Sequence, residues 1–231
     1  MFARPAKRQR PIETEELRTL VAWLLGDPSP WHLLVLLQHL LHYFGLMRRG
    51  AVSWLTYRAV PGTVDFAADS HTFVGRWSGG ECVHFMIYRD KNLLGGARRV
   101  TLPDLIPMLP GLSLISVLRH LLRFRSRDYG CWLGIATQAL GRPDQRTFEE
   151  REWRASRALV CKILQTDGIA TTAFRRGYVW ALYRHNVSRD KLAKIGFWDP
   201  DSNAMDVYSG VSGQERCEHI TSLTTLDILH T

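Results

Sequence analysis

The run WHLLVLLQHLLHYFGLM, Trp31 to Met47, decides the fold because it is the most hydrophobic stretch of the chain. Three histidines and a glutamine interrupt it, so it predicts a buried helix and not a membrane span, which needs about 20 predominantly apolar residues. Two of the histidines, His39 and His42, lie about one helical turn apart and could in principle hold a metal ion. Within so apolar a helix, we expect them to be core or groove residues.

Helical patterns continue on both sides of this run. Thr14, followed by Glu15 and Glu16, predicts an N-cap with acidic residues in the first turn of a helix that reaches Leu25. Ser188 is expected to cap a short helix that ends near Ile195. Between these, helical spacing predicts further helices over residues 112–124, 147–164 and 174–184.

The hydrophobic period changes to two near the middle of the chain. Val83, Phe85 and Ile87 alternate with neighbouring residues, which predicts a strand over 82–88. A turn within 90–96 and a return strand over 98–102 would form a hairpin, and a third strand is expected within 71–77 because an isolated hairpin is rarely stable. The predicted fold class is therefore α+β, mainly helical, with a small three-stranded antiparallel sheet.

Composition limits the function. The chain has 231 residues, 45% of them hydrophobic, which is enough for one substantial core. Its formal net charge of +8 attracts polyanions, which favours nucleic acid over an anionic membrane as the partner.

The cysteines and the N-terminus indicate the compartment. Cys82, Cys131, Cys161 and Cys217 are too widely spaced to suggest a thiolate metal site, and they read as reduced thiols. The N-terminal sequence MFARPAKRQRP is basic but is not followed by the apolar run of a secretory signal. We expect an intracellular protein, in the nucleus of a eukaryote or the cytoplasm of a prokaryotic or virus-infected cell.

The first indication of a functional site is the segment FRRGYVWALYRHN, Phe174 to Asn186. It predicts an apolar helix that begins with two arginines. Arginine is electrostatically unfavourable there, because the N-terminal end of a helix already carries partial positive charge. An anion such as a phosphate, bound by Arg175 and by backbone N–H groups, would compensate. Gly177 would let a ligand or another backbone segment approach closely. The alternative is that both arginines are solvated surface residues.

Five segments together resemble the catalytic domain of tyrosine recombinases, the phage-integrase-like enzymes of DNA recombination, integration and mobile elements. FGLMRRGAVSWL is similar to the first arginine box and matches its arginine to Arg48. YRDKNLLGGARRVTLP resembles the hairpin that carries the catalytic lysine, matching Lys91. FRRG resembles the second arginine box at Arg175, and IGFW followed by DVYSG resembles the end that carries Trp198 and the nucleophile Tyr208. The segments occur in the family order.

The resemblance implies a specific mechanism. Tyr208 would attack a DNA phosphate to give a 3′-phosphotyrosine intermediate, while the two arginines neutralise the nonbridging oxygens. Lys91 would protonate the departing 5′-oxygen, and the Trp198 indole would donate to a phosphate oxygen or pack behind the nucleophile. No metal and no other cofactor is expected.

Two positions depart from the family pattern. The histidine that usually precedes the second arginine by three residues is replaced by Thr172, whose hydroxyl can donate to phosphate but is a poor base. The acidic residue that often follows the first arginine is replaced by Ala51, which leaves the choice between Arg48 and Arg49 open.

The resemblance also divides the chain. Residues 1–12 are expected to be a basic flexible arm, 13–208 the catalytic domain, and 209–231 a tail that either packs on a neighbouring protomer or folds back on its own domain. Double-stranded DNA is the expected partner, bound by a tetramer on paired sites. Besides the catalytic set, phosphate-backbone contacts are expected from Arg49, Arg98, Arg99 and Arg176.

Three functions remain open at this point. The first is site-specific strand exchange. The second is DNA binding without cleavage by a relative of the fold that has lost turnover. The third is relaxation of DNA like that of a type IB topoisomerase, with the same nucleophile.

Overall fold

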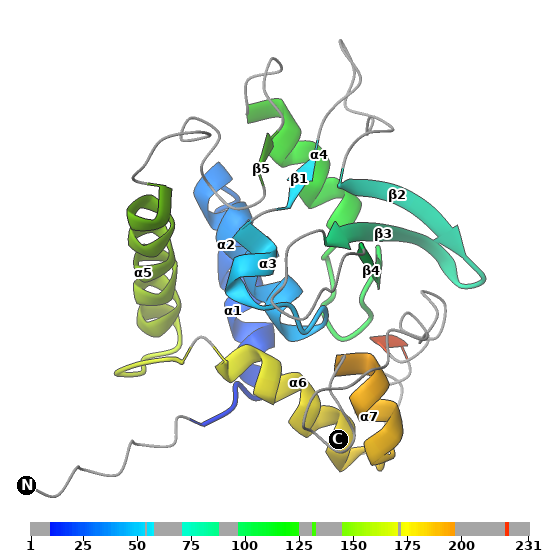
Figure 1. Cartoon of the computed structure of the whole chain (residues 1–231). Helices are drawn as coiled ribbons and strands as arrows, with labels where there is room; N and C mark the ends of the chain where they lie inside the picture. The colour runs from blue at the N-terminus through cyan, green and yellow to red at the C-terminus, as the bar shows by residue number, and fades with distance from the viewer. Residues whose placement is uncertain are drawn as a thin grey trace, which may run out of the picture.

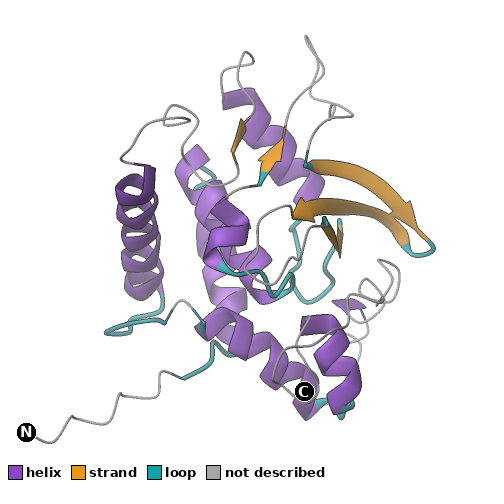
Figure 2. Ribbon diagram, viewed as in Figure 1, coloured by secondary structure: helices purple, strands orange, loops and turns teal. Residues whose placement is uncertain are grey.

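The computed structural model describes residues 10–53, 55–57, 71–87, 97–124, 131–132, 145–170, 172–196 and 220–221. The helices are α1 (Thr14–Gly26), α2 (Pro30–Tyr43), α3 (Arg49–Ser53), α4 (Leu114–Phe124), α5 (Gln145–Ile163), α6 (Ala173–Arg184) and α7 (Arg189–Gly196). The strands are β1 (Thr56–Tyr57), β2 (Thr72–Trp77), β3 (Gly80–Ile87), β4 (Arg98–Pro103) and β5 (Cys131–Trp132). Helices predominate, and the predicted mixed, mainly helical class is confirmed (Figure 2).

Helix α2 is the centre of the core, as its sequence predicts. The Ser29 hydroxyl accepts a hydrogen bond from the His32 N–H at 3.2 Å, and Pro30 takes the first helical position, where a missing N–H costs nothing. Every residue from Leu33 to Tyr43 is buried. Figure 1 shows α2 between α5 on one side and the β2–β3–β4 sheet on the other, with α6 below it.

The helix ends at Tyr43, earlier than the predicted Met47. Leu46 adopts a left-handed backbone conformation with a φ of 51°. A right-handed α-helix cannot continue through such a residue. Gly45 allows the turn, because a Cβ there would lie 2.5 Å from the Leu41 carbonyl oxygen. The early end of α2 turns the chain so that Arg48 and Arg49 begin a new short helix, α3.

The start of α1 differs by one residue from the prediction. The N-cap is Glu13 and not Thr14, which is the first helical residue. The Glu13 N–H donates to the Glu16 carboxylate at 2.9 Å, so the acidic residue of the first turn satisfies the backbone group that precedes the helix.

All three predicted strands are present in one antiparallel sheet of order β2–β3–β4. Val83 of β3 lies between Val74 of β2 and Leu102 of β4, and alternate side chains such as Phe85 enter the core. The predicted turn within 90–96 lies outside the described residues.

Three short elements were not predicted. Helix α3 has only five residues, and the pairing of β1 with β5 joins two-residue strands that are far apart in sequence. None of them is long enough to show a period.

The remaining helices agree with prediction within a few residues. Ser188 caps α7, because its hydroxyl accepts from the Lys191 N–H at 3.3 Å and its carbonyl from the Leu192 N–H at 2.8 Å. In the tail, Ile220 is completely buried in the core of its own chain. Within the described part of the chain, no helix has both the length and the apolar character needed to cross a bilayer.

Candidate anion site at the start of α6

The first turn of α6 places a hydroxyl and two guanidinium groups at the positive end of the helix. The Thr172 carbonyl accepts from the Arg176 N–H at 2.9 Å, so Thr172 occupies the N-cap position and Arg175 the third helical position. Acidic side chains are favoured at such positions, and α6 has none in its first turn. The local charge therefore suits a bound anion.

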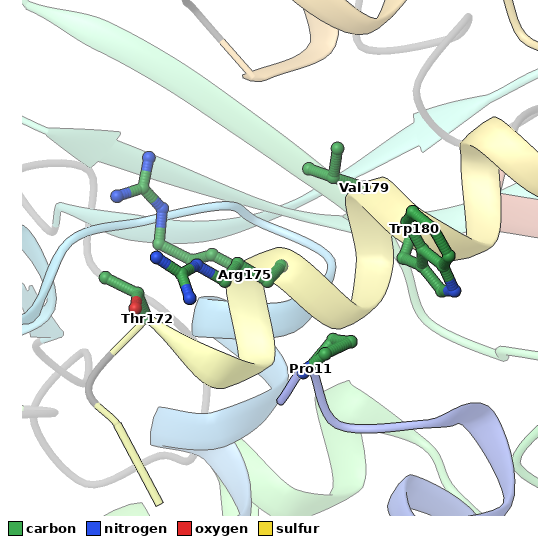
Figure 3. Close-up of a pocket in the computed structure, with 6 residues that line it drawn as sticks. Pro11, Thr172, Arg175, Val179 and Trp180 are labelled. Carbon is green, nitrogen blue, oxygen red and sulfur yellow. The ribbon is translucent and has the colours of Figure 1, made fainter. Parts of the chain in front are cut away.

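These side chains share one face of α6 and line a pocket of about 390 Å³ (Figure 3). Spacings of three, four, seven and eight residues place them on the same side of the helix. Across from them lies Pro11, from the segment that precedes α1. The described lining contains no acidic residue and consists of Pro11, Thr172, Arg175, Arg176, Val179 and Trp180.

Gly177 serves backbone packing, which is one of the two roles considered for it. A Cβ at this position would lie 2.0 Å from the Ile12 carbonyl oxygen and 3.0 Å from the Tyr43 ring. The Ile12 N–H donates to the Ala173 carbonyl at 3.1 Å, so the segment before α1 crosses α6 in direct contact with it. This crossing fixes α6 against the end of α2.

The first arginine segment begins where α2 ends. The Nδ1 atom of His42 lies 2.8 Å from the Met47 carbonyl oxygen. Because a carbonyl only accepts, Nδ1 carries the proton. The next carbonyl, that of Arg48, accepts from the Ala51 and Val52 N–H groups and so starts α3. Ala51 is 3% exposed, so an acidic residue at this position would be buried.

His42 lies between the two arginine segments. Its side chain is buried and contacts the edge of the Trp153 ring, with ring centroids 5.0 Å apart. The pKa of His42 is lowered to about 4, mainly by burial. The hydrogen bond to Met47 opposes this shift, and the charges of Arg175 and Arg49 contribute to it. Both arginines are thus close enough to act on one buried imidazole, and that imidazole is neutral at physiological pH.

His39 links the same region to α5. Its ring stacks on Phe174 with a centroid distance of 4.3 Å, and its Nε2 lies 3.0 Å from the Ser156 hydroxyl of α5. Burial, followed by the charge of His42, lowers its pKa well below the usual range. The expectation that these histidines belong to the core is confirmed. Their position within an apolar helix predicted that they are buried, but it could not predict their contacts with α5 and α6.

The structure places some predicted site residues and not others. Thr172 and Arg175 lie together at the start of α6, and Arg48 and Arg49 lie at the start of α3. The predicted catalytic residues Lys91, Trp198 and Tyr208 are outside the described residues.

The predicted phosphate contact of Arg98 needs correction. Its side chain is only 8% exposed, whereas that of Arg99 is exposed. Successive side chains of a strand point to opposite faces of the sheet, so the pair cannot present both guanidinium groups to one surface. Arg99 and Arg176 are both exposed.

The described residues contain no group of three or more metal-ligating side chains. Comparisons of the chain with protein-family models, curated proteins and solved structures found no match.

Proposed function

We propose that the protein cleaves and rejoins DNA strands at specific sites through a 3′-phosphotyrosine intermediate, as tyrosine recombinases do. One observation carries the proposal. The segment that begins with Arg48 and the segment that contains Arg175 adjoin the same buried, neutral His42. The charges of Arg49 and Arg175, from two distant parts of the sequence, therefore act on the same imidazole. The Thr172 hydroxyl lines the same pocket as Arg175.

The scissile phosphate would lie at the start of α6. Arg175 and one of the first pair, Arg48 or Arg49, would contact its nonbridging oxygens and stabilise the charge that develops in the transition state. The Thr172 hydroxyl would donate to the same phosphate. Because His42 is neutral, it adds no positive charge behind the arginines.

Two residues supply the bond changes, and a third supports them. The Tyr208 hydroxyl loses its proton to water as its oxygen attacks phosphorus, the bond from phosphorus to the 5′-oxygen breaks, and that oxygen takes a proton from Lys91. Trp198 donates from its indole N–H or supports the nucleophile. The reverse attack by a 5′-hydroxyl, from the same or another duplex, reseals the strand.

Covalent trapping tests this directly. The protein is incubated with a pool of nicked duplexes of random sequence, and a protein–DNA band that resists SDS and disappears with protease is the expected result. Tyr208→Phe removes the attacking oxygen and should abolish the band while DNA binding persists. A Tyr208→Phe variant that still forms the band would contradict the assignment of the nucleophile.

The two arginines of α6 give a matched pair of variants. Arg175→Ala should abolish cleavage, because Arg175 lines the same pocket as Thr172 and its charge lowers the pKa of the buried His42. Arg176→Ala should weaken binding to all DNA sequences without abolishing cleavage. Equal and mild losses for both would contradict the placement of the phosphate.

Thr172 favours a second candidate, a DNA-binding protein that does not cleave. Its hydroxyl is a poor general base, and in the fold it occupies an N-cap position, where threonine is commonly found for structural reasons. Absence of a covalent band from protein that binds the pool would support this candidate. Thr172→His then tests whether a base at this position restores cleavage.

A further inference from the structure

The pocket beside α6 has an apolar end that phosphate binding does not use. Val179, Trp180 and Pro11 line this end, beyond Arg175 along the helix (Figure 3). The Trp180 side chain is 46% exposed although it is among the largest apolar side chains in the protein. Exposed aromatic surface at a pocket is typical of a site that a partner covers.

The Trp180 ring is held in place from outside the pocket. The guanidinium of Arg184 lies over the ring, 5.6 Å from its centroid, and Arg184 is not among the residues that line the pocket. The same guanidinium makes two hydrogen bonds to the Glu13 carboxylate, at 3.0 and 3.3 Å. The indole is therefore oriented before any ligand binds, which lowers the entropic cost of stacking on it.

The other end of the pocket is cationic. Arg175 and Arg176 line it together with the Thr172 hydroxyl. Arg176 lies four residues before Trp180, on the same side of α6 and about 6 Å away along the helix axis, so a phosphate and a ring joined by one sugar can reach both side chains. The volume of about 390 Å³ lies within the range of small-ligand pockets. The complementary ligand has a flat apolar ring joined to a phosphate.

We propose that this pocket binds an unpaired nucleobase, stacked on Trp180, from the strand whose phosphate lies at Thr172 and Arg175. The identification of the polymer as DNA rests on the proposed function, but the pocket does not depend on cleavage. A nucleic acid fits better than a phosphorylated aromatic peptide because the whole chain carries a net charge of +8. A base in a duplex is already stacked and paired, so the pocket selects strand ends, gaps and nicks.

The experiment compares two single-stranded probes with equal numbers of phosphates, a thymidine hexamer and an abasic hexamer, by fluorescence anisotropy at one salt concentration. We expect the protein to bind the thymidine hexamer about tenfold more tightly, because stacking one base on an aromatic ring gives a gain of this order. Trp180→Ala should reduce the preference to about twofold or less, whereas Trp180→Phe should retain most of it.

Trp23→Ala is the matched control. Trp23 is 43% exposed, but it lies on α1, packs edge-on against His32 and is not among the pocket-lining residues. This variant should keep the full preference. Equal binding of the two probes by the parent protein, or equal losses in Trp180→Ala and Trp23→Ala, would overturn the proposal. A phosphotyrosine peptide that displaces the thymidine hexamer at a lower concentration than unlabelled hexamer would also overturn it and would assign the pocket to a protein partner.

The result can be separated from the fate of the cleavage proposal. Tyr208→Phe should show the same preference for the thymidine hexamer as the parent protein. If the preference is present but no covalent complex forms, the result supports the base pocket and contradicts the strand-transfer function. If covalent trapping succeeds but the two probes bind equally, the base pocket fails alone.

Discussion

His42 connects three parts of the candidate site through one side chain. Its Nδ1–H donates to the Met47 carbonyl, immediately before Arg48, and its ring contacts Trp153 of α5. The charges of Arg175 and Arg49 act on it from α6 and α3. A proton on His42 would place a third positive charge inside this cluster, so the fold requires the neutral form.

This requirement predicts a loss of stability in acid. The folded pKa of His42 is about 4, below the ordinary histidine pKa of 6.5. As pH falls below 6.5, the unfolded chain binds a proton that the folded chain excludes, so the free energy of unfolding decreases until the pH reaches about 4. The decrease due to His42 should be about 3 kcal/mol, from 1.36 kcal/mol per pKa unit. Urea unfolding at pH 7.5 and pH 4 measures it.

A variant isolates this contribution from other groups that titrate in acid. His42→Gln keeps an amide N–H that can donate to Met47 and has no proton to gain. Its free energy of unfolding should therefore fall by about 3 kcal/mol less than that of the parent between the two pH values. His39 remains in both proteins, and its lowered pKa acts in the same direction. An identical pH dependence in parent and variant would show that His42 is not held neutral.

The sequence could predict single residues where the cause is local. Arg175 was predicted from the unfavourable charge at a helix start, whereas Thr172 was singled out only through the family resemblance. The partners of His39 could not be predicted, because Ser156 lies 117 residues away and reaches it only through the packing of α5 on α2. Arg98 and Arg99 are adjacent and of one residue type, and only the orientation of β4 separates a buried guanidinium from an exposed one.

At the scale of elements, the contact between α6 and the segment before α1 sets the position of the site. Gly177 of α6 faces the Ile12 carbonyl, and Pro11, the neighbour of Ile12, forms one side of the pocket. The Glu13–Arg184 ion pair connects the same two elements about two turns further along α6. The pocket thus depends on how closely these backbones approach.

Gly177→Ala should disrupt this contact. The added Cβ would overlap the Ile12 carbonyl, and backbone atoms on both sides cannot move aside cheaply. We expect a loss of about 2–4 kcal/mol in the free energy of unfolding and weaker binding of DNA, measured by urea unfolding and fluorescence anisotropy.

Gly26→Ala is the control for this substitution. Gly26 ends α1, and nothing lies within 4 Å of a Cβ built there. The variant should be as stable as the parent or slightly more stable, because alanine restricts the unfolded chain. If Gly177→Ala were equally harmless, the close contact between α6 and the N-terminal segment would not exist in solution.

Sequence reasoning was more reliable for elements than for their ends. Alternation predicted the strand over 82–88, the turn after it predicted the return strand, and the low stability of an isolated hairpin predicted the third strand. The end of α2 was misplaced because hydrophobicity continues through Phe44, Leu46 and Met47, and only the backbone conformation of Leu46 stops the helix. The pairing of β1 with β5 has no period to detect and arises from the packing of distant segments.

Over the whole molecule, positive charge exceeds negative charge by eight, and several exposed arginines lie on different elements. Arg49 lies on α3, Arg99 on β4 and Arg176 on α6. Helix α5, which carries the exposed Arg154, lies on the opposite side of α2 from the sheet (Figure 1). If DNA lies across the side formed by α3, the sheet and α6, charges on these elements should matter more than charges on α5.

The salt dependence of DNA binding tests this arrangement. Each phosphate neutralised by the protein releases counterions, so the logarithm of the association constant falls with the logarithm of salt concentration by about 0.9 per contact. Arg49→Ala, Arg99→Ala and Arg176→Ala should each reduce the magnitude of this slope by about one, whereas Arg154→Ala should leave it unchanged. Arg98→Ala should lower stability instead, because its side chain is buried. Slopes that respond equally to Arg99→Ala and Arg154→Ala would indicate diffuse attraction by net charge, without a defined DNA-binding side.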